Sequence, residues 1–134
     1  MRTIMIRNAY CIPVVMAIAL VSLPALSHHS DRMYDLDTTI TLEGVVSEFQ
    51  YSNPHAWLLV DVTNSDGTVT TWGFEGAAAS NMLRAGVRPG DLAPGTRVTI
   101  SGHPMRDGRP AAEWITTFRQ DDNKEFNPRS YRVE

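Results

Sequence analysis

Five short segments of this sequence alternate between apolar and polar residues, and turn-forming residues separate them. They span residues 38–49, 56–63, 68–75, 96–102 and 111–118. A period of two places the apolar residues of each segment on one face, which is typical of half-buried β-strands. Residues 76–85 differ, because their alanines, methionine, leucine and arginine favour a helix. The pattern predicts a mostly β chain with one short helix between the third and fourth strands.

Glycine residues mark the places where the predicted elements bend or end. Gly44 interrupts the first strand and suggests a bulge or a sharp bend. Asp66-Gly67 supplies the positive φ angles that a tight hairpin turn needs. For the helix, Ser80 is the candidate N-cap and Gly86 the candidate C-cap. The first three strands are therefore expected to form a meander that leads into the helix.

Three strands, a helix and two further strands is the element order of the OB-fold, a five-stranded, partly open Greek-key barrel. A first strand that bends at a glycine suits a closing barrel. We expect residues 28–118 to form one small OB-like barrel, with a different small β-sandwich or roll as the alternative. Residues 119–134 are mostly polar and are expected to form a C-terminal tail, from which Phe126 and Tyr131 could pack back on the domain.

The first 27 residues have the pattern of a cleavable secretory signal. Arg2 and Arg7 give a positive start, and residues 12–23 are nearly all apolar. Small residues precede a cleavage point after Ser27. The apolar run is shorter than the ~20 residues that a transmembrane helix needs, although an uncleaved anchor is the alternative. The pattern predicts a periplasmic or secreted protein without a stable membrane anchor after cleavage.

Cysteine content and charge exclude several function classes for the processed chain. The only cysteine, Cys11, lies inside the predicted signal, so neither disulfides nor thiolate chemistry are expected after cleavage. The chain has a formal net charge of −3, and cleavage also removes Arg2 and Arg7. Excess negative charge repels the phosphate backbone, so nucleic acid is not an expected partner.

Histidines are the residues most suited to chemistry in this chain, and all four follow the predicted cleavage point. Cleavage after Ser27 would make His28 the first residue, with a free amine beside its imidazole. The amine, whose ordinary pKa is ~7.7–8.0, and the imidazole together can chelate one metal ion. Nitrogen ligands in a tetragonal arrangement suit Cu(II). The candidate metal ligands are His28, His29, His55 and His103.

Convergence of these histidines depends on the barrel. His55 follows the first strand and His103 ends the fourth, and in an OB barrel the corresponding loops flank the same face. The segment before the first strand could carry His28 to that face, at up to ~3.3 Å per residue. The alternative is that the histidines are solvated or bind only their own loops, since no HExxH or CxxC spacing is present.

Aromatic residues offer a second kind of site. Trp57 has the opposite phase to its apolar neighbours, so it is the better candidate for an exposed stacking face, whereas Trp72 and Trp114 suit the core. The candidate ligand-binding residues are Tyr51, Trp57, Trp72 and Glu75. A hydrolase that uses Glu75 is the least favoured hypothesis, because no nucleophile-elbow or phosphate-cradling motif is present. We therefore expect a protein that is not an enzyme.

Several short motifs, taken in order, resemble a family of small exported bacterial proteins, the domain of unknown function 6152. The motifs are His28-His29-Ser30, Leu42-Glu43-Gly44, Asn53-Pro54-His55-Ala56-Trp57, Trp72-Gly73-Phe74-Glu75-Gly76 and Leu92-x-Pro94-Gly95-Thr96. The resemblance runs from His28 to about Phe118. It implies export and a shared His-His-Ser start and Asn-Pro-His motif, which carry over to His28, His29 and His55. It implies no activity and assigns no motif to His103, and Asp31 stands where many members have an aromatic residue.

The leading hypothesis from the sequence is an exported small barrel that binds copper through His28 and His55, with His29 or His103 as further ligands. The alternative is a module that binds a small ligand or a protein through the barrel face without metal.

Overall fold

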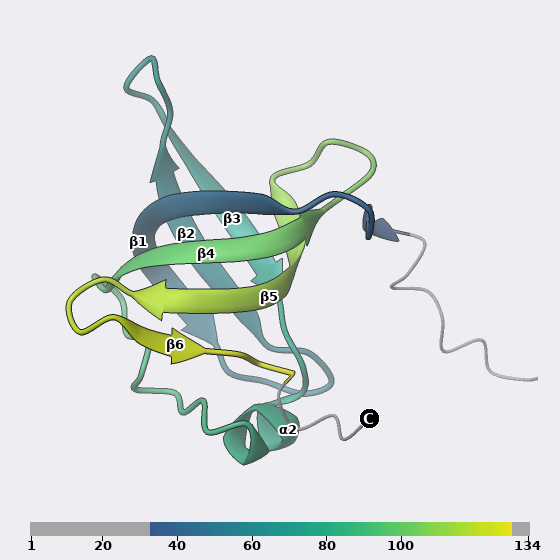
Figure 1. Cartoon of the computed structure of the whole chain (residues 1–134), viewed down its shortest axis with the longest axis vertical. Helices are drawn as coiled ribbons and strands as arrows, with labels where there is room; N and C mark the ends of the chain where they lie inside the picture. The colour runs from purple at the N-terminus through teal and green to yellow at the C-terminus, as the bar shows by residue number, and fades with distance from the viewer. Residues whose placement is uncertain (1–32, 130–134) are drawn as a thin grey trace, which may run out of the picture.

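A computed structural model describes residues 33–129 of the chain (Figure 1). The elements are β1 (Ile40–Gln50), β2 (Trp57–Thr63), β3 (Val69–Glu75), α2 (Ala79–Arg84), β4 (Arg97–Pro104), β5 (Ala111–Arg119) and β6 (Lys124–Phe126). Their order confirms the predicted series of three strands, a helix and two strands. The sixth strand lies in the segment that we expected to be a polar tail.

The first five strands form a closed barrel, as predicted. Strand β1 is shared by two antiparallel pairings, with β2 on one side and β4 on the other. Strands β3 and β5 close the barrel with a parallel pairing that is only three residue pairs long, from Gly73↔Ala111 to Glu75↔Glu113. This short seam between β3 and β5 brings residues from distant parts of the sequence together.

Strand β1 curves strongly across the barrel in Figure 1, and two features permit this. The sequence suggested a bulge at Gly44, but the register shifts between Val46 and Glu48, so the bulge lies a few residues later. Gly44 is instead needed for a close approach, because a Cβ atom there would lie 2.5 Å from the carbonyl oxygen of Asp61 and 2.6 Å from Val60 Cγ1. The glycine lets β1 pass closely over β2.

The helix α2 is shorter than predicted, and its N-cap differs. The N-cap is Ala78, without a side-chain cap, and Ser80 lies inside the first turn, so the Ser80 prediction was wrong. At the other end Gly86 has a φ of 78°, and Val87 N donates to the carbonyl of Met82 at 2.9 Å. This is a Schellman motif, which confirms the role expected for Gly86.

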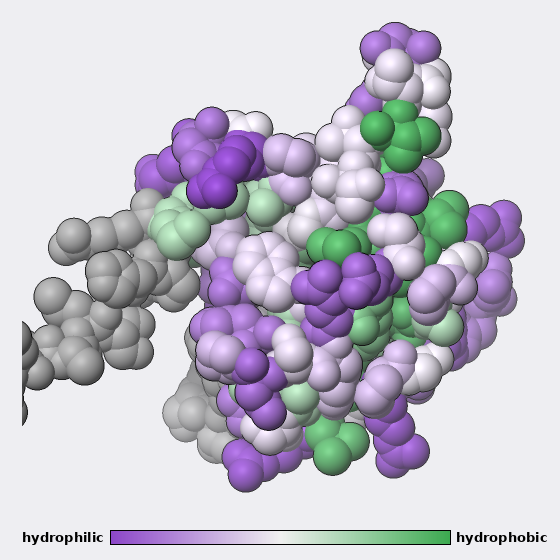
Figure 2. Space-filling model, turned by 180° about the vertical axis from the view of Figure 1, so that it is seen from behind, coloured by the Kyte–Doolittle hydropathy of each residue, from purple (hydrophilic) through white to green (hydrophobic). Residues whose placement is uncertain are grey.

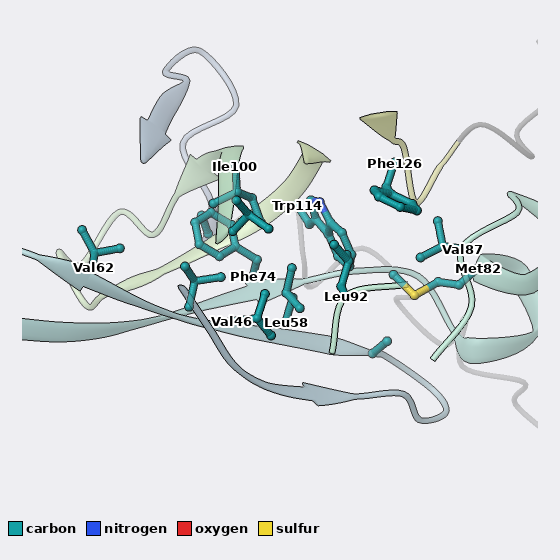
Figure 3. Packing of buried hydrophobic residues seen from close by; sticks show 14 residues of the cluster. Val46, Leu58, Val62, Phe74, Met82, Val87, Leu92, Ile100, Trp114 and Phe126 are labelled. Carbon is teal, nitrogen blue, oxygen red and sulfur yellow. The ribbon is translucent and has the colours of Figure 1, made fainter. Parts of the chain in front are cut away.

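The core fills the barrel and continues beneath α2 (Figure 3). Leu58, Phe74, Ile100 and Trp114 are fully buried inside the barrel, and Met82 from α2 is fully buried at its end. Phe126 of β6 is also buried, so part of the predicted tail belongs to the core. Burial of Phe126 explains why three residues pair as a strand, since an aromatic side chain contributes ~1.5–3 kcal/mol on burial.

Large hydrophobic residues that remain exposed come from different elements. Figure 2 shows apolar residues on the rear face in separate spots between hydrophilic ones. The large hydrophobic residues that are exposed, counted over both faces of the molecule, are Met33, Leu36, Val45, Val69, Leu83 and Phe118. Over residues 33–129 no helix is long and apolar enough to cross a membrane. The predicted signal, residues 1–27, lies outside the described residues.

Candidate functional site

The connector between β1 and β2 places His55 beside the end of β3. Ala56 N donates to the carbonyl of Ala77 at 3.0 Å, and Gly76 N donates to the carbonyl of Ala56 at 2.8 Å. On the other side of His55, Ser52 Oγ donates to the His55 carbonyl at 2.8 Å. The connector is therefore held at both ends, and its imidazole lies next to the last residue of β3, Glu75.

His55 and Glu75 form the central contact of the site. His55 Nδ1 lies 3.1 Å from Glu75 Oε1, and the two side chains are 51% and 17% exposed. A carboxylate cannot donate a hydrogen bond, so a proton on Nδ1 suits this ion-pair contact. In the neutral ring this leaves the electron pair on Nε2, which has no partner among the described residues. Glu75 thus orients a half-exposed imidazole with one nitrogen available.

Tyr34 occupies the second oxygen of Glu75. Its hydroxyl donates to Glu75 Oε2, although Tyr34 precedes Glu75 by 41 positions and lies before the first strand. The side chain is only 1% exposed. Burial, followed by the hydrogen bond to Glu75, raises the pKa of the Tyr34 hydroxyl well above its ordinary value. Tyr34 therefore remains a neutral donor at physiological pH and fixes the rotamer of Glu75.

Residues 33–35 are held against the start of the β4–β5 connector, residues 104–106, and we call this contact the N-terminal clasp. Asp35 N donates to the Pro104 carbonyl at 2.8 Å, and Arg106 N donates to the Met33 carbonyl at 2.9 Å. Arg106 Nε also donates to the Tyr34 carbonyl at 3.1 Å. The clasp fixes where the chain enters the barrel.

Glu113 lies directly beside Glu75 across the parallel seam. The two residues are Cα partners on adjacent strands, and the Glu113 side chain is only 8% exposed. Arg129, at the end of the described chain, pairs with Glu113 through its guanidinium. A buried carboxylate beside a partly buried one would be repelled by it, so each needs its own partner: Arg129 for Glu113, and Tyr34 with His55 for Glu75.

His103 lies beside Glu113 on the next strand, so Glu75, Glu113 and His103 are neighbours across β3, β5 and β4, but the side chain of His103 has a different partner. It pairs with Glu113 in the β4–β5 ladder, so it stands two strands from Glu75, roughly 10 Å at ~4.8 Å per strand. His103 Nδ1 donates to the carbonyl of Thr38 at 2.7 Å. His55 and His103 are therefore on one side of the barrel, each with Nδ1 engaged, and their hydrogen-bond partners are separate.

The other predicted metal ligands, His28 and His29, lie outside the described residues. Within residues 33–129 no group of three or more histidine, cysteine, aspartate or glutamate side chains could hold a metal ion. The described part of the chain thus supplies His55 as one oriented imidazole. A site with three nitrogen ligands requires residues from outside it.

The predicted aromatic residues fall in three different places. Trp57 is half-buried on the outer surface, where its ring lies over Gly73, because a Cβ atom on Gly73 would be 3.2 Å from it. Trp72 packs against the core, and Trp114 is fully buried. The Tyr51 hydroxyl donates to the carbonyls of Ala79 and Val87 at 3.0 and 2.8 Å. Of this set, only Trp57 and Glu75 are neighbours in the β2–β3 ladder.

A shallow groove of about 350 Å³ lies elsewhere, over the outer surface of β1, β2 and β4. Its lining contains none of the predicted site residues. It consists of Glu43, Gly44, Val45, Asp61, Thr63, Arg97 and Gln120. The guanidinium of Arg97 is already paired with Asp121 at 3.0 Å.

Sequence reasoning identified His55 and Glu75 but missed Tyr34, Glu113 and Arg129. Glu113 lies between Ala112 and Trp114 on β5 and is buried, and Arg129 pairs with its carboxylate. The one feature that could have pointed to a buried Tyr34 is an aromatic residue in the mostly polar segment before the first strand.

Comparison with known proteins gives a family and no more. Searches of curated proteins and of solved structures found no match. The sequence model of one family, described as a family of unknown function, matches residues 16–113, which is most of the chain. The match ends at the third residue of β5, where the parallel seam also ends. The chain therefore belongs to the family of unknown function DUF6152.

Proposed function

We propose that this protein is an exported small barrel that binds copper(II) after signal cleavage. The amine and imidazole of His28 supply two nitrogen ligands, and His55 Nε2 supplies the third. His29 and His103 are further ligands available to the same ion. The role is binding rather than catalysis, and the place of action is the periplasm or the exterior of the cell.

The orientation of His55 is the single observation that carries this proposal. Histidines that ligate a metal through one nitrogen almost always donate the other N–H to a carboxylate, a carbonyl or water. His55 Nδ1 has such a partner in Glu75 at 3.1 Å, while half of its side chain stays exposed. Tyr34 fixes Glu75 in turn. The imidazole is held ready in the tautomer that a metal requires.

The route of the chain supports His28 as the partner ligand. Tyr34 lies at the site, and His28 precedes it by six positions. Six residues span at most roughly 20 Å when extended, so His28 can reach His55. An amine and two imidazoles form a T-shaped set of nitrogen ligands, and tetragonal nitrogen coordination favours Cu(II) over other divalent ions of the first row.

A copper titration of three proteins tests the proposal. The first begins at His28 with a free amine, the second begins at His28 with an acetylated amine, and the third begins at His28 and has His55→Ala. Acetylation removes the terminal amine as a ligand without adding a new chelating sequence, so we expect at least tenfold weaker copper binding in the second and third proteins. Glu125→Gln, at an exposed position on β6 that is not a proposed ligand, is the matched control, with an expected change of less than about threefold.

Two results would contradict the proposal. Equal copper affinity in the first two proteins would mean that the terminal amine is not a ligand. Mass spectrometry of the exported protein is the other test, and a first residue other than His28 would remove the principal ligand.

The alternative is a module that binds a small ligand or a protein through the barrel face without metal. The observation that favours it is the half-buried Trp57 ring on the outer surface over Gly73, next to Glu75 in the ladder. In this alternative the histidines have no role, so the three proteins of the titration bind copper equally weakly.

A further inference from the structure

The outer surface of strands β1, β2 and β3, which we call the meander face, carries side chains that the barrel does not bury. Strands β2 and β3 lie behind β1 and β4 in Figure 1, so this face is turned towards the viewer in Figure 2, where apolar and hydrophilic residues are mixed. Three rows of ladder neighbours cross it, namely Gln50–Trp57–Glu75, Glu48–Leu59–Gly73 and Val45–Asp61–Thr71.

Trp57 and Leu59 form the apolar centre of the meander face. Both side chains are half-buried, and both lie over Gly73, where a Cβ atom would be 3.2 Å from Trp57 Cε3 and 3.6 Å from Leu59 Cδ2. Farther along the same face, Val45 and Val69 are 41% and 60% exposed. An indole that the backbone of β3 supports and that stays partly exposed is the kind of side chain on which binding surfaces are centred.

The charge of these three strands has one sign. They contain four acidic residues and neither lysine nor arginine. Glu75 is used by Tyr34 and His55, but Glu43, Glu48 and Asp61 have no basic partner among the described residues. Asp61 accepts from the Thr71 hydroxyl at 2.6 Å, which leaves its charge uncompensated. Such a surface favours a cationic partner, because charges across an interface are arranged to be complementary.

The shallow groove of about 350 Å³ continues the meander face towards β4, and Glu43, Val45 and Asp61 line it. Asp61 lies four residues after Trp57 on β2, which is about 13 Å at ~3.3 Å per residue. In an extended segment, side chains on one side recur every second residue. The groove and the indole therefore match side chains four positions apart in an extended segment.

We propose that the meander face binds an extended, arginine-bearing segment of a partner protein, with one arginine over Trp57 and another in the groove beside Asp61. Arginine suits both positions, because its planar guanidinium stacks on an indole and pairs with a carboxylate through two hydrogen bonds. Glu48 is diagonal to Trp57 across the β1–β2 ladder, within reach of the first arginine. None of these residues is a proposed copper ligand, so the inference does not rest on copper binding.

A second copy of this chain fits the meander face less well. The basic residues of β4, β5 and β6 already have acidic partners within their own chain, in the pairs Arg97–Asp121, Arg119–Asp122 and Lys124–Asp91. Docking them on another copy would require these pairs to break. A different protein with unpaired arginines is therefore the occupant.

Titration with a synthetic peptide tests the inference. The probe is a nine-residue peptide of serine and threonine with blocked ends and arginines at its third and seventh positions. It is titrated into the processed protein by calorimetry, with a metal chelator present. We expect saturable binding that weakens at least about threefold when lysines replace both arginines, because an ammonium lacks the planar fork. Moving the second arginine to the sixth position turns it to the other side, with a similar expected loss of about threefold.

Three variants of the protein locate the binding surface. Trp57→Leu keeps an apolar cover over Gly73 and should weaken peptide binding at least about fivefold. Asp61→Asn keeps an acceptor for Thr71 but loses the charge, and should weaken binding about threefold. Glu125→Gln removes a charge from β6, outside the meander face, and should change the affinity by less than about 1.5-fold.

Several results would overturn the inference. They are absence of peptide binding, equal affinity for the arginine and lysine peptides, and unchanged affinity in Trp57→Leu. A dimer of the free protein that Trp57→Leu converts to a monomer would also overturn it, because the face would then belong to a second copy. Peptide binding should be unaltered in His55→Ala, so failure of the meander face and failure of the copper site are measured in different variants.

Discussion

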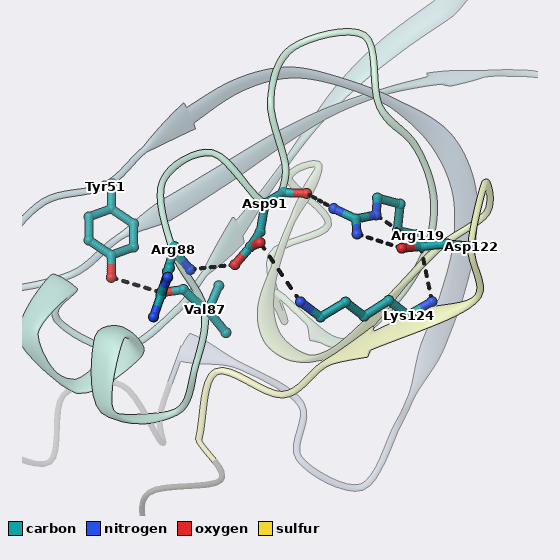
Figure 4. A network of polar contacts seen from close by, with 7 residues as sticks. All are labelled: Tyr51, Val87, Arg88, Asp91, Arg119, Asp122 and Lys124. Carbon is teal, nitrogen blue, oxygen red and sulfur yellow. Dashed lines mark hydrogen bonds and ion pairs between the residues drawn. The ribbon is translucent and has the colours of Figure 1, made fainter.

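Two polar clusters of this barrel contain similar residues but differ in burial. The seam cluster consists of Tyr34, His55, Glu75, Glu113 and Arg129. The loop network consists of Asp91, Arg119, Asp122 and Lys124, and it joins the connector after α2 to the turn between β5 and β6 (Figure 4). The carboxylates of the seam cluster, Glu75 and Glu113, are 17% and 8% exposed, and those of the loop network, Asp91 and Asp122, are 20% and 47% exposed.

The loop network leaves no charge without a partner among its members. Arg119 donates to both oxygens of Asp122, at 2.9 and 2.6 Å, and Lys124 Nζ lies 3.8 Å from Asp91 Oδ1. Arg119 and Lys124 also lie over the ring of Phe126. Every group is used in holding two loops together, so the network is structural.

The seam cluster differs because one of its atoms is not used by the fold. Each carboxylate has its partners, but His55 Nε2 has none among the described residues. Partnered carboxylates beside one half-exposed nitrogen that has no partner are an arrangement suited to binding. The comparison teaches that the nitrogen left without a partner, rather than the number of charges, distinguishes the candidate site from the loop network. Three predictions test this difference.

The largest effect is expected for Arg129→Ala in the seam cluster. Glu113 would then be a buried carboxylate without a partner, and we expect the free energy of unfolding to fall by about 2 kcal/mol. Arg97→Ala is the matched control, because the Arg97–Asp121 pair is 66% and 62% exposed and should contribute less than ~0.5 kcal/mol. Urea unfolding measures both. Equal losses would show that burial does not distinguish the Arg129–Glu113 pair from an exposed ion pair.

A smaller effect is expected for Glu75→Gln. Glutamine has one acceptor oxygen where glutamate has two, and its NH2 group would face either the Tyr34 hydroxyl or His55 Nδ1, so one of them loses its acceptor. We expect roughly tenfold weaker copper binding in the protein that begins at His28, which is a typical loss for a partner of a ligating histidine. Glu125→Gln, on the exposed edge strand β6, should leave the affinity unchanged. An unaltered affinity in Glu75→Gln would remove Glu75 from the site.

The smallest effect is expected for Asp122→Asn in the loop network. The hydrogen bonds from Arg119 lower the pKa of Asp122 from 3.8 to about 2. A lowered pKa in the folded state stabilises the protein above the unfolded pKa, and this stability is lost as the pH falls towards 2. Asp122→Asn should therefore be slightly less stable than the native protein above about pH 4 and equal to it below pH 2. A difference that grows in acid would contradict this assignment.

Local sequence patterns were sufficient for the barrel. Each of the five predicted strands overlaps the observed one, because a period of two in β-branched residues and the glycine turns act within a few positions. The chain order of elements then determined the topology, because few closed arrangements accommodate three strands, a helix and two strands. The C-terminal turn of α2 at Gly86 was predictable for the same local reason.

Features that depend on distant contacts were not predictable. Strand β6 has only three residues, and its pairing with β5 depends on the burial of Phe126. The N-cap of the helix is Ala78 rather than Ser80, because backbone hydrogen bonds to Ala56 and Ser52 hold Ala77 and Ala79.

The same limit applies to the candidate site. His55 and Glu75 could be singled out by residue type. Their contact, however, joins the connector before β2 to the end of β3, and the contact of Glu75 with Tyr34 spans 41 positions. No spacing within a motif encodes such pairs. The predictions for His28 and His29 lie outside the described residues and remain predictions.

The three-residue parallel seam has a consequence for the molecule as a whole. It is the only join between β3 and β5, and its last pair, Glu75↔Glu113, also forms the floor of the seam cluster. A ligand bound as proposed at Glu75 would stabilise the pairing of β3 with β5, because Glu75 belongs to the last pair of the seam. Slower hydrogen exchange of the seam amides in the presence of copper would then report its binding.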